Sequence, residues 1–204
     1  MDAIVMVGGR GGDIGIEEKP TLLLLDKPLI CHVIDALELA EHVDDIVIAL
    51  SPLSLKTKER IEEIYGERIK VIVTPGTNYV TDMVHAVKQS NILDPVLIVM
   101  YDLAMITPDI IEFVIEEYNK CEKPSMSVHV PLSIFKDVES KPETVFNRNG
   151  RFISPAGINV MDGKDIDREQ EDCNLIIDRK ELAYNLNTVY DLDVCERIMA
   201  TRRG

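Results

Sequence analysis

A glycine-rich stretch near the amino terminus contains the residues best suited to chemistry. Five glycines fall within eight residues: Gly8, Gly9, Gly11, Gly12 and Gly15. Glycines let backbone N–H groups come close to an anion and face it from several directions. Lys19 follows within a Glu-Lys-Pro sequence and could add a full positive charge. The combination predicts a site for the phosphates of a nucleotide.

Three kinds of phosphate loop could explain this stretch, and a glycine-rich turn between strand and helix is the structural alternative. A Walker loop requires Gly-Lys before Ser or Thr, whereas Lys19 precedes a proline. A dinucleotide loop would place its third glycine at Ile14, so only a looser spacing that ends at Gly15 fits. Such a fold also has an acidic ribose ligand at the end of the second strand, where this sequence has Ser-Pro. The nucleotidyltransferase signature, Gly-Gly-x-Gly-x-Arg-x-Gly followed by Glu-Lys-Pro, fits everywhere except at Asp13. We therefore favour the nucleotidyltransferase interpretation.

An acidic residue closely follows the most apolar strand candidate. Residues 95–100 are Pro-Val-Leu-Ile-Val-Met, and Tyr101-Asp102 comes next. An aspartate at the carboxyl end of a buried strand can hold a Mg²⁺ ion that bridges nucleotide phosphates, and a turn or helix-capping aspartate is the structural alternative. Residues that leave the other strand ends could contact a nucleotide base or simply terminate the strands. They are Ser51, Pro52, Thr74 and Gly76.

Strand and helix patterns alternate through the first two thirds of the chain. They predict an α/β, Rossmann-like fold with a mostly parallel central sheet flanked by helices. The predicted strands span residues 3–7, 45–50, 69–73 and 95–100, and the predicted helices span 28–40, 53–65, 79–89 and 110–118. The last third predicts strands at 126–130, 158–161 and 182–187, a solvated acidic loop at 162–172 and a helix at 189–202. Because ligands bind beyond the carboxyl ends of such strands, the candidate residues should meet at one edge.

The composition is that of a globular protein of about one domain, with 204 residues, of which 46% are hydrophobic and 28% charged. The net charge of −14 argues against a nucleic-acid partner, because an acidic surface repels phosphates. The scattered cysteines and histidines lack a zinc-binding spacing and indicate reduced thiols in a cytoplasm. No apolar run approaches the ~20 residues that span a bilayer, and no signal peptide is visible, so we expect a cytoplasmic protein. The apolar Ile110, Val114 and Ile198 could serve a homodimer as readily as a core.

Several short segments along nearly the whole chain carry a family resemblance. They are residues 1–3 with the glycine loop and Glu18-Lys19-Pro20, then residues 49–52, 56–59, 102–103, 155–160 and 185–188. The chain resembles the MobA-like nucleotidyltransferases that guanylate cofactors, and within them those that act on adenosylcobinamide phosphate. The molybdenum-cofactor guanylyltransferases share a similar Asn-x-Asn-Thr ending and are the nearest alternative, followed by other small-molecule phosphate nucleotidyltransferases.

The resemblance implies a fold like that of nucleotide-diphospho-sugar transferases. It implies a single domain, residues 1–204, in which residues 1–123 bind the nucleotide and residues 124–204 bind the acceptor. The implied reaction transfers GMP from GTP to adenosylcobinamide phosphate, releasing pyrophosphate and giving adenosylcobinamide-GDP in cobalamin biosynthesis, with Mg²⁺ as cofactor. Because a phosphate monoester has a second pKa near ~6, this acceptor is already ionised and needs no general base.

The same resemblance implies roles for individual residues. Lys19 would steady the α-phosphate and the leaving pyrophosphate, and Asp102 would hold Mg²⁺. The phosphates would be cradled by Gly8, Gly9, Arg10, Gly11 and Gly12. Guanine would be recognised near Ser51, Pro52, Thr74 and Gly76, and the acceptor side would be lined by Gly157, Asn185 and Asn187.

Asp13 stands where the family has an arginine that contacts the triphosphate. At an effective dielectric of ~20, like charges ~4 Å apart repel by roughly 4 kcal/mol. Either Asp13 faces away and Arg10 supplies the cation, which we favour, or nucleotide binding is weakened. A non-catalytic nucleotide-binding descendant is the alternative from another class, and the retained Lys19 and Asp102 argue against it.

Overall fold

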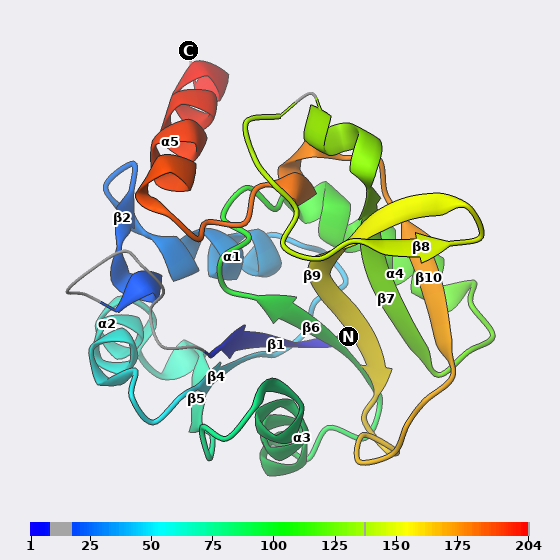
Figure 1. Ribbon diagram of the computed structural model, residues 1–204. Coiled ribbons are helices and arrows are strands. Elements are labelled where there is room, and N and C mark those ends of the chain that lie inside the picture. Colours follow the sequence, from blue (N-terminus) through cyan, green and yellow to red (C-terminus); the bar gives the residue numbers. More distant parts are fainter. Residues whose placement is uncertain (9–17, 137, 204) are drawn as a thin grey trace.

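One sheet of eight strands forms the centre of the fold, with helices on both of its faces (Figure 1). The computed structural model describes residues 1–8, 18–136 and 138–203. Gly9, Arg10, Gly11, Gly12 and Asp13 therefore lie outside the described residues. The strands of the sheet are β1 (Asp2–Val7), β4 (Ile46–Leu50), β5 (Lys70–Val73), β6 (Pro95–Met100), β7 (Ser125–Pro131), β8 (Phe146–Arg148), β9 (Arg151–Asp162) and β10 (Asp172–Ile176). A separate hairpin consists of β2 (Leu23–Leu24) and β3 (Lys27–Pro28).

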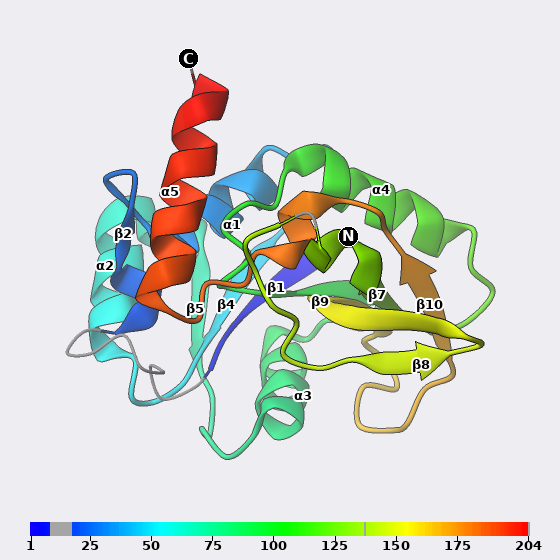
Figure 2. The ribbon, with the colours of Figure 1, turned by 45° about the horizontal axis from the view of Figure 1, so that its top comes forward.

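The helices are α1 (Leu29–Glu38), α2 (Leu55–Tyr65), α3 (Tyr79–Ser90), α4 (Pro108–Asn119) and α5 (Val189–Arg203). Short 3₁₀ helices are η1 (Lys19–Thr21), η2 (Gly66–Arg68), η3 (Leu132–Lys136) and η4 (Lys180–Ala183). Helices α1 and α4 cover one face of the sheet and α3 covers the other (Figure 1). The first half of α5 packs on the α1 side through Val194 and Cys195, while its carboxyl end stands out from the body (Figure 2).

The apolar run of β1 shows why a two-sided sheet forms. Successive side chains of a strand point to opposite faces. Accordingly Val5 and Val7 pack in the larger core under α1 and α4, whereas Ile4 and Met6 pack in the smaller core under α3. A strand that is buried on both faces requires apolar residues at every position, which is the pattern of a central parallel strand.

The strand order β10-β7-β9-β6-β1-β4-β5 places the site. Strand β1 pairs in parallel with β4 on one side and with β6 on the other. The chain runs outward from β1 through β4 and β5 and then returns to the opposite side of β1. Ligands bind at such a reversal in open α/β sheets. Gly8 leaves β1 at this point and Asp102 follows β6, so the fold brings these two segments together.

Strand β9 lies between β6 and β7 and runs antiparallel to both. Its register against β7 shifts between Ser127 and His129, which marks a bulge near Gly157. Gly157 has φ +73°, and a Cβ atom there would lie 3.2 Å from Met100 Cγ. Both the left-handed backbone and the close approach favour glycine. The bulge thereby fits β9 against the carboxyl end of β6.

The predicted fold class and the elements of the first two thirds are confirmed, but the last third differs. The strand predicted at residues 182–187 is wrong, because η4 ends at Ala183 and an irregular segment follows it. Leu182 and Leu186 are buried in the core, which accounts for their apolar character although neither belongs to a strand. A short apolar run does not by itself distinguish these cases. The edge strand β10 was not predicted.

The residues considered for a homodimer lie in or against the core of the single chain. Ile110 and Val114 are buried residues of α4, and the partly buried Ile198 packs against the same core. These residues therefore do not define a dimer surface, and the homodimer stays a prediction. Within the described part of the chain, no helix is long and apolar enough to cross a membrane.

Candidate active site

Lys19 lies buried at the point where the strand order reverses. Its Nζ donates a hydrogen bond to Asn187 Oδ1 at 2.7 Å and lies 3.3 Å from Asp102 Oδ2. The ring centroid of Tyr101 is 5.5 Å from the same nitrogen, a cation–π distance. A buried ammonium requires partners of this kind. Three segments far apart in the sequence therefore meet at this one charge.

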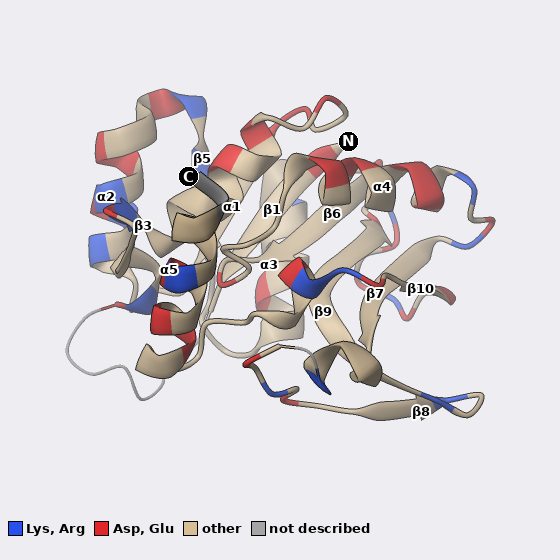
Figure 3. Ribbon diagram, turned by 90° about the horizontal axis from the view of Figure 1, so that it is seen from above, with Lys and Arg blue, Asp and Glu red and all other residues tan. Residues whose placement is uncertain are grey.

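The Lys19–Asp102 contact differs from the other ion pairs among the described residues. The Lys19 and Asp102 side chains are 6% and 13% exposed, whereas every other pair has at least one partner with 31% or more of its side chain exposed. The excess acid is spread along surfaces such as that of α4 (Figure 3). Because water and salt screen exposed pairs, Lys19 and Asp102 interact more strongly than the surface charges do.

Glu18 anchors the segment that carries Lys19. Its carboxylate accepts hydrogen bonds from Lys56 N at 3.0 Å, Thr57 N at 2.7 Å and Thr57 Oγ1 at 2.6 Å. These N–H groups lie in the first turn of α2, where the helix itself offers no acceptor. Partial burial acts to raise the pKa of Glu18, but the hydrogen bonds from Thr57 and Lys56 outweigh it and the net pKa is lowered. Glu18 thus caps α2 and fixes the position of Lys19.

Replacing Glu18 with alanine should lower the free energy of unfolding by about 1–2 kcal/mol at about pH 7, the usual cost of losing such a cap. Because the pKa of Glu18 is lower in the folded state, its ionised form stabilises the fold above the unfolded pKa, and this contribution disappears as the pH falls through the folded pKa. Urea unfolding at about pH 7 and about pH 3 tests this. Glu59→Ala, at an exposed position of α2, is the control. A difference that does not shrink in acid would contradict the capping role.

A pocket of about 430 Å³ lies beyond the carboxyl ends of β1, β4 and β5. It is lined by four of the residues predicted to bind nucleotide: Gly8, Ser51, Thr74 and Gly76. Pro52 lies behind Gly76, where a Cβ atom would approach Pro52 Cδ to 2.6 Å, and Gly76 has φ +71°. Glycine is therefore required at this turn. The structure brings the predicted base-binding segments into one pocket.

Several polar groups of this pocket are used within the protein. The Thr74 amide and hydroxyl both donate to Leu50 O, at 2.8 and 3.0 Å. Asp82 Oδ1 accepts from Gly76 N at 2.9 Å and from Thr77 N at 3.4 Å. These hydrogen bonds shape the turn after β5. Thr74 and Gly76 therefore determine the shape of the pocket, and the donors that bind Leu50 O and Asp82 are not available to a ligand. The sequence analysis did not single out Asp82, although its partners lie only five and six residues before it.

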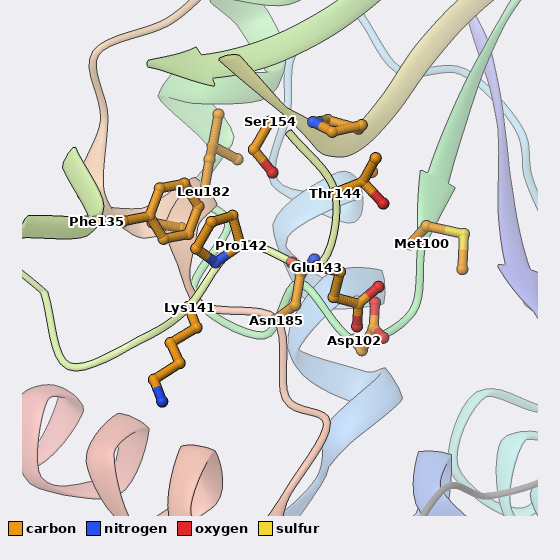
Figure 4. A pocket seen from close by; sticks show the side chains of 13 residues that line it. Met100, Asp102, Phe135, Lys141, Pro142, Glu143, Thr144, Ser154, Leu182 and Asn185 are labelled. Atoms are coloured by element: carbon orange, nitrogen blue, oxygen red, sulfur yellow. The ribbon is translucent and has the colours of Figure 1, made fainter. Parts of the chain in front are cut away.

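Two further pockets lie on the other side of Met100, whose side chain also lines the 430 Å³ pocket. The nearer one, of about 170 Å³, is lined by Asp102, Gly157 and Asn185 (Figure 4). It adjoins a hollow of about 690 Å³ lined by residues 138–143 and the start of α5. Asn185 and Asn187 line this hollow. The acceptor-side residues predicted from the sequence therefore lie together, next to the partners of Lys19.

Residues of the segment before β8 also line these two pockets, and the sequence did not single them out. Phe135, Pro142 and Glu143 line both, and so does Lys141, whose ammonium points away from Asp102 and Glu143 in Figure 4. The spacing of these residues does not predict a site, because the segment has no periodic pattern. The segment is placed by the pairing of β8 with β9, which the sequence did not predict.

Asn187 is fixed by the first turn of α5. Asp191 Oδ2 accepts from Asn187 N at 3.0 Å and Thr188 N at 2.8 Å, and Asp191 N donates to Thr188 Oγ1 at 3.2 Å. This reciprocal arrangement is that of a capping box. The backbone of Asn187 is thereby tied to the start of α5, which explains why a threonine follows directly.

The oxygen atoms around Lys19 are of a kind that suits Mg²⁺. A carboxylate oxygen of Asp102 and an amide oxygen of Asn187 both face the same cationic group. Mg²⁺ prefers hard oxygen ligands and commonly uses one or two carboxylates together with substrate phosphates. Residues 1–8, 18–136 and 138–203 contain no cluster of three or more His, Cys, Asp or Glu residues that could hold a metal ion. The residues present therefore fit a Mg²⁺ ion that the nucleotide phosphates help to bind.

Comparison with known proteins identifies the family of this chain. The model of the MobA-like NTP transferase domain matches residues 3–132. The adenosylcobinamide-phosphate guanylyltransferase of Methanocaldococcus jannaschii is 34% identical over 201 residues, covering 98% of this chain and 97% of that protein. A probable molybdenum cofactor guanylyltransferase of Thermococcus kodakarensis is 28% identical over 130 residues, covering 61% of this chain and 57% of that protein.

Solved structures share the fold. A CMP:2-keto-3-deoxy-manno-octonic acid synthetase complexed with CTP superimposes with a TM-score of 0.74 at 15% identity, over 99% of this chain and 100% of that one. A hypothetical transferase from Thermus thermophilus gives 0.70 at 14% identity, over 94% and 98%. At these identities the likeness concerns the fold alone. The domain match and the full-length relative show that this chain belongs to the MobA-like NTP transferase family.

Proposed function

We propose that the protein transfers GMP from GTP to adenosylcobinamide phosphate, releasing pyrophosphate. One observation carries the proposal: Lys19 is held by Asp102 and Asn187, which line two neighbouring pockets, and Met100 lines both the first of these and the pocket at the ends of β1, β4 and β5. A transferase with two anionic substrates needs such an arrangement. The name of the full-length relative, an adenosylcobinamide-phosphate guanylyltransferase, supports the choice of substrates.

Alignment of the substrates and neutralisation of charge would supply most of the catalysis. An oxygen of the acceptor phosphate attacks the α-phosphorus of GTP, the bond to the β-phosphate breaks, and pyrophosphate leaves. The acceptor phosphate is ionised at neutral pH, so no side chain has to remove a proton. Lys19 would turn its ammonium from Asp102 and Asn187 toward phosphate oxygens as charge develops there. A preorganised charge of this kind commonly contributes ~10²-fold or more to a rate.

Asp102 and Asn187 would hold Mg²⁺, through a carboxylate and an amide oxygen. When bound, the ion would neutralise phosphate charge and help pyrophosphate to leave. This assignment gives Asn187 a role beside the nucleotide phosphates in addition to its place on the acceptor side. It also explains why Asp102 lies next to a lysine, because the contact orients the carboxylate toward the site.

The acceptor would lie in the two pockets beyond Met100. The larger hollow has an aromatic and apolar wall that includes Phe135, Pro142 and Tyr190. Three carboxylates, Glu139, Glu143 and Asp191, and one lysine line it as well. This balance disfavours a strongly anionic acceptor. It favours a corrinoid with neutral carboxamide side chains over the more anionic molybdenum cofactor, the acceptor suggested by the partial-length relatives.

The test combines nucleotide binding with an acceptor assay. In calorimetry with Mg²⁺, GTP should bind more tightly than ATP, CTP or UTP. With GTP present, adenosylcobinamide phosphate should release pyrophosphate and give adenosylcobinamide-GDP, detected by mass spectrometry, whereas molybdenum cofactor should react far more slowly.

Three outcomes of this test would each contradict a different part of the proposal. Tighter binding of CTP or UTP would place the protein in another branch of the superfamily. Faster reaction of molybdenum cofactor would overturn the acceptor. Nucleotide binding without transfer to either acceptor would favour the non-catalytic descendant.

A further inference from the structure

The side chain of Asn187 makes two different hydrogen bonds, one at each end of its amide. Its Oδ1 accepts from Lys19 Nζ at 2.7 Å, and its Nδ2 donates to Glu143 Oε1. Glu143 comes from the segment between η3 and β8, which passes the segment leading into α5 in both Figure 1 and Figure 2. Both residues line the 690 Å³ hollow, and Glu143 also lines the pocket of Asp102.

The chemistry of the two partners fixes which way the amide faces. An ionised carboxylate only accepts hydrogen bonds and an ammonium only donates them. Asn187 must therefore present its NH₂ group to Glu143 and its oxygen to Lys19. The reversed amide would set a donor against the ammonium and an oxygen against the carboxylate.

Glu143 becomes the decisive partner once substrates bind. Lys19 would then turn toward phosphate oxygens, so it would no longer hold the oxygen of Asn187 in place. The backbone of Asn187 stays fixed by Asp191, but that contact does not set the rotation of the side-chain amide. Only Glu143, among the contacts described for this side chain, can keep Oδ1 directed at the site after Lys19 has moved.

The segment that carries Glu143 also contacts α5 at a second, separate point. Four residues earlier in the same segment, Glu139 Oε2 accepts from Tyr190 Oη at 2.9 Å and from Arg197 Nη2 at 2.8 Å. Glu139 thus ties the segment to α5, the helix that begins two residues after Asn187. Segment and helix therefore hold Asn187 from two sides.

We propose that Glu143 is a positioning residue, which orients the amide oxygen of Asn187 toward the Lys19–Asp102 site while the segment before β8 lines the acceptor pockets. This inference rests on the proposed function, because it gives Asn187 its task there. It adds a residue whose hydrogen bond goes to Asn187, and not to Lys19 or Asp102, among the described residues, so that it acts through Asn187.

The test compares Glu143→Ala with Glu143→Gln in the full-length protein. Partners that orient a ligand side chain typically contribute 10–100-fold. Glu143→Ala should therefore lower GMP transfer by ~10-fold or more and raise the Mg²⁺ concentration for half-maximal rate. Glu143→Gln retains an oxygen acceptor and should recover most of the rate. Glu139→Ala removes the contacts of the same segment with α5 but keeps the hydrogen bond between Glu143 and Asn187. Equal losses of rate in Glu139→Ala and Glu143→Ala would mean that Glu143 only attaches the segment to the protein, and would overturn the proposal.

A double-mutant cycle with Asn187→Ala gives the sharpest result. If Glu143 acts through Asn187, Glu143→Ala should change nothing further in the Asn187→Ala background. A loss of the same size in both backgrounds would overturn the proposal.

A readout that needs no turnover separates this inference from the proposed function. The side-chain NH₂ signals of Asn187 in ¹H–¹⁵N NMR spectra should shift in Glu143→Ala and less in Glu143→Gln. Unchanged signals in Glu143→Ala would contradict the contact itself. A shift without any GMP transfer by the unmodified protein would instead refute the proposed reaction while leaving the Glu143–Asn187 contact in place.

Discussion

Replacing Lys19 with methionine is expected to lower the rate of GMP transfer by ~10²-fold or more, since one preorganised charge is removed from the transition state. Methionine keeps an unbranched side chain over the ring of Tyr101, so the change removes the charge with little loss of packing. Single-turnover pyrophosphate release, measured at saturating GTP and acceptor, reports the step directly. A variant with normal pyrophosphate release would remove Lys19 from the mechanism.

A matched control distinguishes the loss of the Lys19 charge at the site from a general change in the net charge of the protein. Lys164→Met makes the same change at an exposed residue that follows β9 near the opposite edge of the sheet. It should leave pyrophosphate release unchanged. Thermal unfolding of the Lys19 variant shows whether the unpaired Asp102 destabilises the fold, because removing one member of a buried pair leaves a charge without a partner. A rate loss that merely followed unfolding would not support a catalytic role.

Asp102→Asn is expected to have the second large effect, lowering the rate by ~10²-fold and raising the Mg²⁺ concentration for half-maximal activity. The amide offers Mg²⁺ an oxygen without a charge, and it also weakens the pairing with Lys19. The rate as a function of Mg²⁺ at fixed GTP measures both changes.

The contrast with Asp94→Asn makes the Asp102 result specific. Asp94 is an exposed aspartate that precedes the same strand, β6, and therefore lies at its opposite end. Its substitution should leave the Mg²⁺ dependence unchanged. If Asp102→Asn turned over normally but lost ~1 kcal/mol of stability, Asp102 would be a capping residue and the metal assignment would be wrong.

The sequence was sufficient for the parallel strands β1, β4, β5 and β6 and for the main charges of the site. Residues 3–7 of β1 and all of β6 are apolar, and Gly8 follows β1 while Tyr101-Asp102 follows β6, so both the strand and its functional end could be recognised locally. Asp102 was identified in this way, and Lys19 from the Glu-Lys-Pro sequence that follows the glycine loop. The structure adds that Lys19 is bound between Asp102 and Asn187, which no local pattern could indicate, because 83 and 168 residues separate the partners.

Residues that act through long-range contacts were missed for the same reason. Glu143 has its partner 44 residues away, and the polar segment around it has no periodicity. Glu18 was noted only as part of a motif, and its capping of α2 appears only once Thr57 is placed beside it. The prediction that Asp13 faces away and Arg10 supplies the missing cation concerns residues outside those described, so it stays a prediction.

The position of β9 between β6 and β7 has a consequence for folding during synthesis. The strands β5, β4, β1 and β6 can assemble once residue 100 has left the ribosome, but the outer edge of β6 must wait for β9, about sixty residues later. That edge carries the run Val-Leu-Ile-Val, and an exposed apolar edge invites pairing with other chains. Strand β7 emerges earlier but is connected to β6 only through β9. The nascent chain therefore passes through a stage that is prone to aggregation, and it ends when the Pro-Ala-Gly-Ile-Asn-Val segment closes the sheet.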